Sequence, residues 1–194
     1  MEKLTTLNLS PDRVLIQLIV PGLIASYPFI ILFFDHIPNA ADFFLQDGRG
    51  LLIAFITLIA LVVGIILENF GSHIEVYYYD KRQKKLHGDS YMDIWKKYLK
   101  ISYSHEPIGQ RYIRNILFRM KFELSMGVAL SFMSAGLLIY NLNNQIFENQ
   151  CLNLFLVYIL PIGIAVYLIF FEGWSSSKIL ESTRRSLVES YYKP

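Results

Sequence analysis

The residues most able to do chemistry gather in the stretch 67–89, LENFGSHIEVYYYDKRQKKLHGD, which directly follows a long uncharged run. Glu68, His73 and Glu75 have the side-chain types that bind zinc. Ligands on one helix need a spacing of three or four residues, whereas His73 is five residues from Glu68 and two from Glu75. We therefore predict no metal site and no other cofactor site here.

A second pattern in this stretch is RQKKLH, in which Arg82 precedes His87 by five positions. It resembles the active-site motif of the HEPN ribonucleases, and this resemblance implies that the two side chains would assist attack by an RNA 2′-hydroxyl. Gly88 is expected to end a helix just where the histidine would have to be held. The chain has no P-loop, G-x-S-x-G, H-E-x-x-H or C-x-x-C motif. We therefore predict no catalytic residue and no enzyme, with the nuclease as a minor alternative.

The third interpretation of the stretch is structural, and we rank it first. Tyr77, Tyr78 and Tyr79 fit the aromatic belt that marks a membrane interface. The basic residues after them fit an anchor to anionic lipid. This interpretation gives no role to Gly71 and His73, and we predict that they form a pivot for the segment that follows.

Four apolar stretches must position these groups: Val14–Phe34, Leu51–Leu67, Phe122–Tyr140 and Leu152–Phe171. A helix needs roughly 17–25 mostly apolar residues to span a bilayer, and 54% of this chain is hydrophobic. Mean hydropathy is +0.37, which is high for a soluble domain. The predicted fold class is an all-α integral membrane protein with four transmembrane helices.

Lysine and arginine are distributed unevenly between the loops. The segment 70–121 holds eleven and the two ends of the chain hold six, whereas the loops 35–49 and 141–150 hold Arg49 alone. Because positively charged loops stay on the cytoplasmic side, we predict that both termini and the segment 70–121 are cytoplasmic. The same segment holds only five acidic residues, so it is positive overall.

We expect four parts: transmembrane helices one and two in 1–70, a cytoplasmic helical hairpin in 71–121, transmembrane helices three and four in 122–171, and a cytoplasmic tail helix in 172–194. The hairpin begins with an amphipathic helix, whose apolar positions are Met92, Trp95, Tyr98 and Leu99 and whose basic positions are Lys96, Lys97 and Lys100. From Pro107 onward nothing breaks the helical pattern before Tyr140. We therefore expect one continuous helix there.

Small residues recur every four positions in the third apolar stretch, at Gly127, Ser131 and Ala135. This pattern lets helices approach closely in lipid, within one subunit or between subunits. No charge lies deep in a predicted span, which disfavours a proton-coupled transporter. Glu68, Glu123 and Glu172 stand at span ends, where we expect them to pair with Lys or Arg.

The layout as a whole suggests a function exercised through a partner. It resembles the four-span membrane subunits (KwaA-like) of the Kiwa anti-phage defence system. This resemblance implies a homo-oligomeric (tetrameric) sensor in the bacterial inner membrane that acts through a cytoplasmic, DNA-binding partner. Residues predicted to contact the partner or lipid are Lys81, Arg82, Lys84, Lys85, Lys96, Lys97, Lys100, Arg111 and Arg114.

Two alternatives stay open beside this sensor or scaffold. One is a pore-forming effector that a cytoplasmic ligand or partner gates, since bent helices with serine and asparagine can line a pore. The other is the nuclease described above. Direct nucleic acid binding by the basic segment is not favoured, because attraction to anionic headgroups explains the charge.

Overall fold

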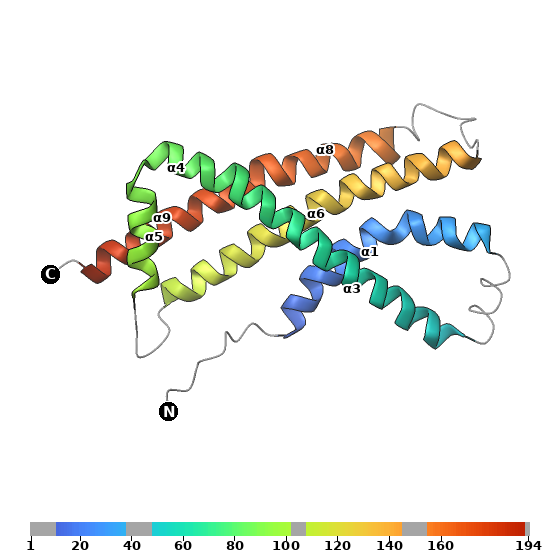
Figure 1. Ribbon diagram of the computed structural model, residues 1–194, viewed down its shortest axis with the longest axis horizontal. Coiled ribbons are helices and arrows are strands. Elements are labelled where there is room, and N and C mark those ends of the chain that lie inside the picture. The colour runs from blue at the N-terminus through green and yellow to red at the C-terminus, as the bar shows by residue number, and fades with distance from the viewer. Residues whose placement is uncertain (1–10, 38–47, 102–107, 145–154, 193–194) are drawn as a thin grey trace. The chain divides into compact units, whose positions relative to one another are not determined.

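The computed structural model describes residues 11–37, 48–101, 108–144 and 155–192, and every regular element in these ranges is a helix (Figure 1). The elements are α1 (Pro11–His36), α3 (Arg49–Ile74), η1 (Glu75–Asp80), α4 (Lys81–His87), α5 (Ser90–Leu99), α6 (Ile108–Asn144), η2 (Phe155–Ile159), α8 (Leu160–Tyr167), η3 (Leu168–Glu172) and α9 (Gly173–Tyr192). The three η elements are π-helical turns, which are wider than an α-helical turn.

Four helical stretches are long and apolar enough to cross a membrane: Leu15–His36, Arg49–His87, Gly109–Leu142 and Val157–Tyr192. The all-helical class and the four apolar helices predicted from the sequence are therefore confirmed. The continuous helix expected after Pro107 is present as α6, about 55 Å long for its 37 residues. Pro107 and Leu152, two predicted boundaries, lie outside the described residues.

The contacts divide the chain into two compact units. The first unit comprises 1–67 and 129–162, and the second comprises 68–128 and 163–194. The predicted hairpin 71–121 and the predicted tail helix thus belong to the same unit, together with the adjoining ends of the apolar helices.

In the first unit α1 and α3 cross with their backbones in close approach. Gly22 faces the carbonyl oxygen of Ala60, and Gly64 faces that of Leu18. A methyl group on either glycine would overlap the opposite backbone, so only glycine permits this separation. Pro28 packs against Gly136 of α6 in the same unit.

The second unit has an aromatic and aliphatic core. Its buried members are Tyr79, Ile113, Ile116, Met120, Leu124, Trp174 and Leu180. Tyr79 is fully buried on η1, and its hydroxyl donates to the carbonyl of Ile169 in η3. A π-helical turn leaves carbonyls without their usual α-helical donor. The Tyr79 side chain on the π-helical turn η1 therefore supplies a donor to a carbonyl of the π-helical turn η3. Gly173 lies against the same hydroxyl, which leaves no room for a side chain there.

Candidate functional site

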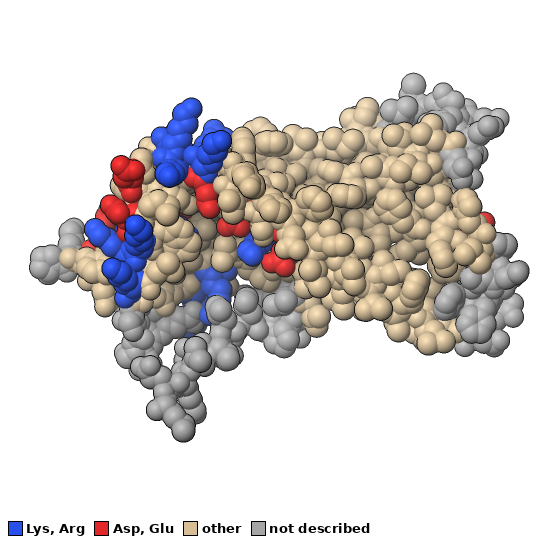
Figure 2. All heavy atoms as spheres, viewed as in Figure 1, with Lys and Arg blue, Asp and Glu red and all other residues tan. Residues whose placement is uncertain are grey.

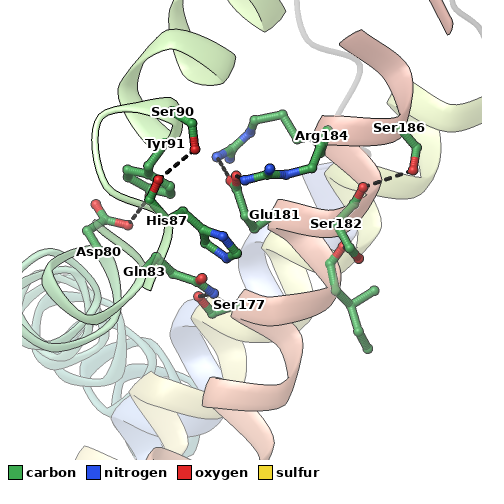
Figure 3. A network of polar contacts seen from close by, with 12 residues as sticks. Asp80, Gln83, His87, Ser90, Tyr91, Ser177, Glu181, Ser182, Arg184 and Ser186 are labelled. Carbon is green, nitrogen blue, oxygen red and sulfur yellow. Dashed lines mark hydrogen bonds and ion pairs between the residues drawn. The ribbon is translucent and has the colours of Figure 1, made fainter. Parts of the chain in front are cut away.

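The polar side chains of the second unit gather where α4 and α5 meet α9 (Figure 3). α4 ends at His87, and Gly88 reverses the chain with φ of +58°, as expected for the glycine after a helix. Ser90 Oγ donates to the His87 carbonyl at 2.6 Å. α5 then packs on α9, which is visible in Figure 1. The turn therefore determines how the predicted basic helix is placed.

Arg184 is the centre of this contact. It is only 6% exposed and its Nη1 donates to Glu181 Oε2 at 3.2 Å, while Arg185 Nη2 lies 3.6 Å from Glu181 Oε1. The Arg184 guanidinium carbon is 4.0 Å from the centre of the Trp95 ring. A desolvated arginine over tryptophan contributes about 2 kcal/mol. α5 is thus attached to α9 through a paired, stacked cation.

Two hydrogen bonds beside this contact join α5 to η1 and α4 to α9. Tyr91 Oη donates to Asp80 Oδ1 at 2.8 Å, and Gln83 Nε2 donates to Ser177 Oγ at 3.4 Å. Burial raises the pKa of the Tyr91 hydroxyl, and the hydrogen bond to the Asp80 carboxylate and its negative charge raise it further. The Tyr91 hydroxyl therefore remains a neutral donor at physiological pH.

These groups enclose a polar cavity of about 40 Å³. Glu75, Asp80, Glu181 and Arg184 are among the side chains that line it. This volume holds about one water molecule and is too small for a metabolite. Within the described ranges no three His, Cys, Asp or Glu side chains are placed to hold a metal ion. The cluster is suited to bracing two helices.

A second set of ion pairs links α6 to η3 and to α3. Arg119 bridges Glu123 at 2.6 Å and Glu172 at 2.7 Å, and Lys121 Nζ lies 3.3 Å from Glu68 Oε1. The predicted pairing of these three glutamates with Lys or Arg is confirmed. Arg119 is 60% exposed and Glu172 29%, and an exposed pair of this kind contributes at most about 1 kcal/mol. The Glu123 side chain is 9% exposed and also accepts a hydrogen bond from Ser176 Oγ at 2.9 Å.

The basic residues predicted for a partner or lipid are spread over three helices. Figure 2 shows Lys and Arg side chains projecting over α4 and α5. Those on the surface are Lys81, Arg82, Lys84 and Lys85 of α4, with Lys96 and Lys97 of α5 and Lys100 just after it. Arg111 and Arg114 lie on α6, and each already interacts with another residue. The structure therefore makes α4 and α5 the main basic surface.

The apolar face of α5 differs from the prediction. Met92 and Leu99 are 41% and 70% exposed, whereas Tyr91 is 5% exposed. The helix is turned toward Tyr91, Trp95 and Tyr98, because Tyr91 finds an acceptor in Asp80 and Trp95 covers Arg184. Lys96, Lys97 and Lys100 remain on the exposed side.

Arg82 and His87, the pair of the nuclease alternative, both lie on α4, and a nuclease role for them stays a prediction. Five residues turn an α-helix by about 140° beyond a full turn, so the two side chains leave α4 in different directions. The Arg82 guanidinium carbon lies 4.3 Å from the Trp174 ring centre. Figure 3 shows the His87 ring beside Gln83 instead.

Both residues predicted as a pivot pack against neighbouring side chains. Gly71 lies within the continuous helix α3, and a Cβ there would be 3.2 Å from that of Leu124 in α6. His73 is exposed and its ring stacks on Tyr77 with 6.0 Å between ring centres. Movement about these residues stays a prediction.

The predicted small-residue face divides into two kinds of position. Gly127 is buried, and a Cβ on it would lie 2.6 Å from Ile169 Cγ1 and 3.2 Å from the Ala165 carbonyl oxygen. It therefore serves close packing within the chain. Ser131 and Ala135 are exposed. Contact of these two with another copy stays a prediction.

Sequence reasoning missed Asp80, Tyr91, Glu181 and Arg184 as a single cluster. A partial signal was present, because Leu180, Arg184 and Val188 recur every four residues and all are buried on one face of α9. Arginine within an apolar stripe indicates a paired or stacked partner. Nothing in the pattern indicated that the partner would be Trp95.

No protein-family model matches the sequence, and no curated protein or solved structure matches it.

Proposed function

We propose that this protein is an oligomeric sensor or scaffold subunit of the bacterial inner membrane that recruits a cytoplasmic protein partner. Both termini, α4 and α5 lie in the cytoplasm in this proposal. Residues 70–121 and the tail form the contact surface, and the resemblance in layout to Kiwa membrane subunits supports a role in antiviral defence.

Membrane insertion is supported by the exposed apolar surface of the helices. In the most apolar part of Arg49–His87 only 17% of residues are buried, and in that of Val157–Tyr192 only 22%. Leu51, Ile53 and Leu58 are each at least 60% exposed. Lipid or another copy of the chain is the environment that suits such faces.

The observation that carries the recruiting role is the attachment of α5 to α9. The Tyr91, Trp95 and Arg184 contacts hold one side of the helix and leave its basic side outward. Leu99 stands among Lys96, Lys97 and Lys100 and is 70% exposed. A rigid helix that presents an apolar residue within basic ones suits an acidic protein surface with an apolar centre.

Photo-cross-linking in cells tests this role. A photoreactive residue in place of Leu99 is expected to trap one cytoplasmic protein, whereas the same residue in place of Leu58 traps lipid or another copy. Glutamate in place of Lys96, Lys97 and Lys100 together should reduce the trapped partner at least about tenfold. Arginine at the same three positions keeps the charge and should preserve trapping.

Absence of any trapped protein from Leu99, with and without infection, would contradict the proposal. Ion leakage from liposomes that contain the purified protein and respond to a trigger would favour the pore instead. Orientation is checked separately with impermeant maleimide after Cys151→Ser. Cysteine in place of Lys97 should react only from the cytoplasmic side, and cysteine in place of Arg49 only from the opposite side.

A further inference from the structure

A groove of about 570 Å³ runs between α3–η1 and η3 in the second unit. We call it the aromatic groove. Its walls include Phe70, Ile74, Tyr77 and Tyr78 on one side and Ile169 and Phe170 on the other. No Lys, Arg, Asp or Glu is among its lining residues, and His73 is the only histidine among them.

The walls are exposed apolar surface built from packed rings. Phe70 is 48% exposed and Phe170 45%. Tyr78 meets Phe170 edge to face, with 5.5 Å between ring centres. A water-soluble ligand would find little in such a groove to replace its hydration, whereas a hydrocarbon chain loses nothing by entering it.

Arg82 stands at one end of the aromatic groove, one helical turn beyond Tyr78. Its Nη1 donates to Tyr78 Oη at 3.3 Å, and its guanidinium carbon lies 4.3 Å from the ring centre of buried Trp174. These contacts hold the guanidinium in place and use few of its five N–H donors. A guanidinium held in this way suits bidentate binding of a phosphate.

The distance from Phe70 to Arg82 and the positive charge of α4 both favour an anionic lipid as the ligand. From Phe70 to Arg82 the helix rises roughly 18 Å, so a chain that lies along the groove and a phosphate at Arg82 can belong to one lipid molecule. The helix that follows Tyr78 and Asp80 is KRQKKLH, with four cations and no acid. A headgroup with net negative charge is therefore favoured over a zwitterionic one.

We propose that the aromatic groove binds an acyl chain of an anionic glycerophospholipid, and that Arg82 binds its phosphate. This inference rests on the membrane placement in the proposed function and not on the recruitment of a partner. The occupant positions α4 relative to the bilayer surface, because chain and headgroup contact adjoining parts of one helix.

Native mass spectrometry of the full-length protein, exchanged into mixed phosphatidylglycerol and phosphatidylcholine, tests the site. The wild type should retain phosphatidylglycerol preferentially. Arg82→Gln should lower that retention about tenfold, the effect of losing one strong charge-assisted contact. Lys84→Gln removes the same charge from a side of α4 about 160° away and should change retention less than twofold.

Phe170→Ala removes one ring from the groove wall and should lower retention of both lipids, with the preference between them unchanged. Equal retention of the two lipids by the wild type would overturn the proposal. An equal loss in Arg82→Gln and Lys84→Gln would also overturn it, because it would indicate diffuse attraction. Failure of the protein to fractionate with membranes would defeat the proposed function itself, so the two failures are distinguishable. Circular dichroism confirms that each variant is folded.

Discussion

Two helix crossings in this protein are held by opposite means. α1 and α3 of the first unit meet through Gly22 and Gly64, where backbone lies on backbone. α5 and α9 of the second unit meet through Trp95, Tyr98 and Arg184, where large side chains that include a buried cation fill the contact. The first crossing depends on the absence of side chains and the second on their pairing.

The difference matches the solvent, lipid or water, in which each kind of helix contact is stable. In lipid the hydrophobic effect does not draw helices together, so close packing of small residues must do so. In water the burial of aromatic rings supplies the driving force, and a buried charge is tolerated if it is paired and stacked. The two crossings should therefore fail differently on mutation.

The largest effect is expected from Arg184→Met. It leaves Glu181 buried with only the 3.6 Å contact to Arg185, and breaking such a pair costs about 3 kcal/mol. Denaturant unfolding in detergent measures the loss. Adding Glu181→Met should restore most of it, whereas a double variant as unstable as the single one would show that the pair is not the cause.

Gly64→Ala should cost about 2 kcal/mol, since its methyl group would overlap the backbone carbonyl of Leu18 and force the helices apart. Gly163→Ala is the matched control because a Cβ there meets nothing within 4 Å. It should be neutral or slightly stabilising by helix propensity. The same unfolding assay compares the two, and equal effects would refute the close crossing.

Tyr91→Phe should cost about 1 kcal/mol, because it removes the donor to Asp80 and keeps the ring. A pH series adds a second signature. The pKa of Tyr91 is higher in the folded protein than in the unfolded chain. The stability it contributes is therefore present below about pH 10 and lost as the pH rises above it. The variant should lose less stability than the wild type above pH 10, and identical pH profiles would contradict this.

Arg119→Gln should have the smallest effect, under about 1 kcal/mol, although Arg119 contacts two glutamates. Water and salt screen an arginine that is 60% exposed, and buried Glu123 keeps the Ser176 hydroxyl as a hydrogen-bond donor. Thermal unfolding at low and high salt checks this, and the difference between the two proteins should shrink as salt rises. A loss of stability as large as that of Arg184→Met would contradict this, because it would show that solvent does not screen the Arg119 network.

The sequence was sufficient for the helices and for some of their pairings. Apolar length predicted the four long helices, and span-end position predicted that Glu68 and Glu172 would pair with cations. Both depend on local properties of the chain: length, hydropathy and distance from a helix end. The end of α4 before Gly88 is likewise local, since a positive φ favours glycine.

Contacts between distant residues could not be predicted. Apolar spacing alone placed Met92 inward, but the register of α5 depends on Asp80 and Arg184, which lie on other helices. Gly22 and Gly64 are 42 positions apart, and no periodicity connects them. Gly127 was identified as a packing residue, but only the structure shows that Ile169 is its neighbour.

The central claim is that α5 is a helix held on α9, ready to present its basic side. Hydrogen–deuterium exchange of the full-length protein in nanodiscs tests it most directly. The amides of residues 94–99 should exchange slowly in the wild type and at least about tenfold faster in Arg184→Met, while those of α3 stay unchanged. Rapid exchange of this segment in the wild type would contradict the claim.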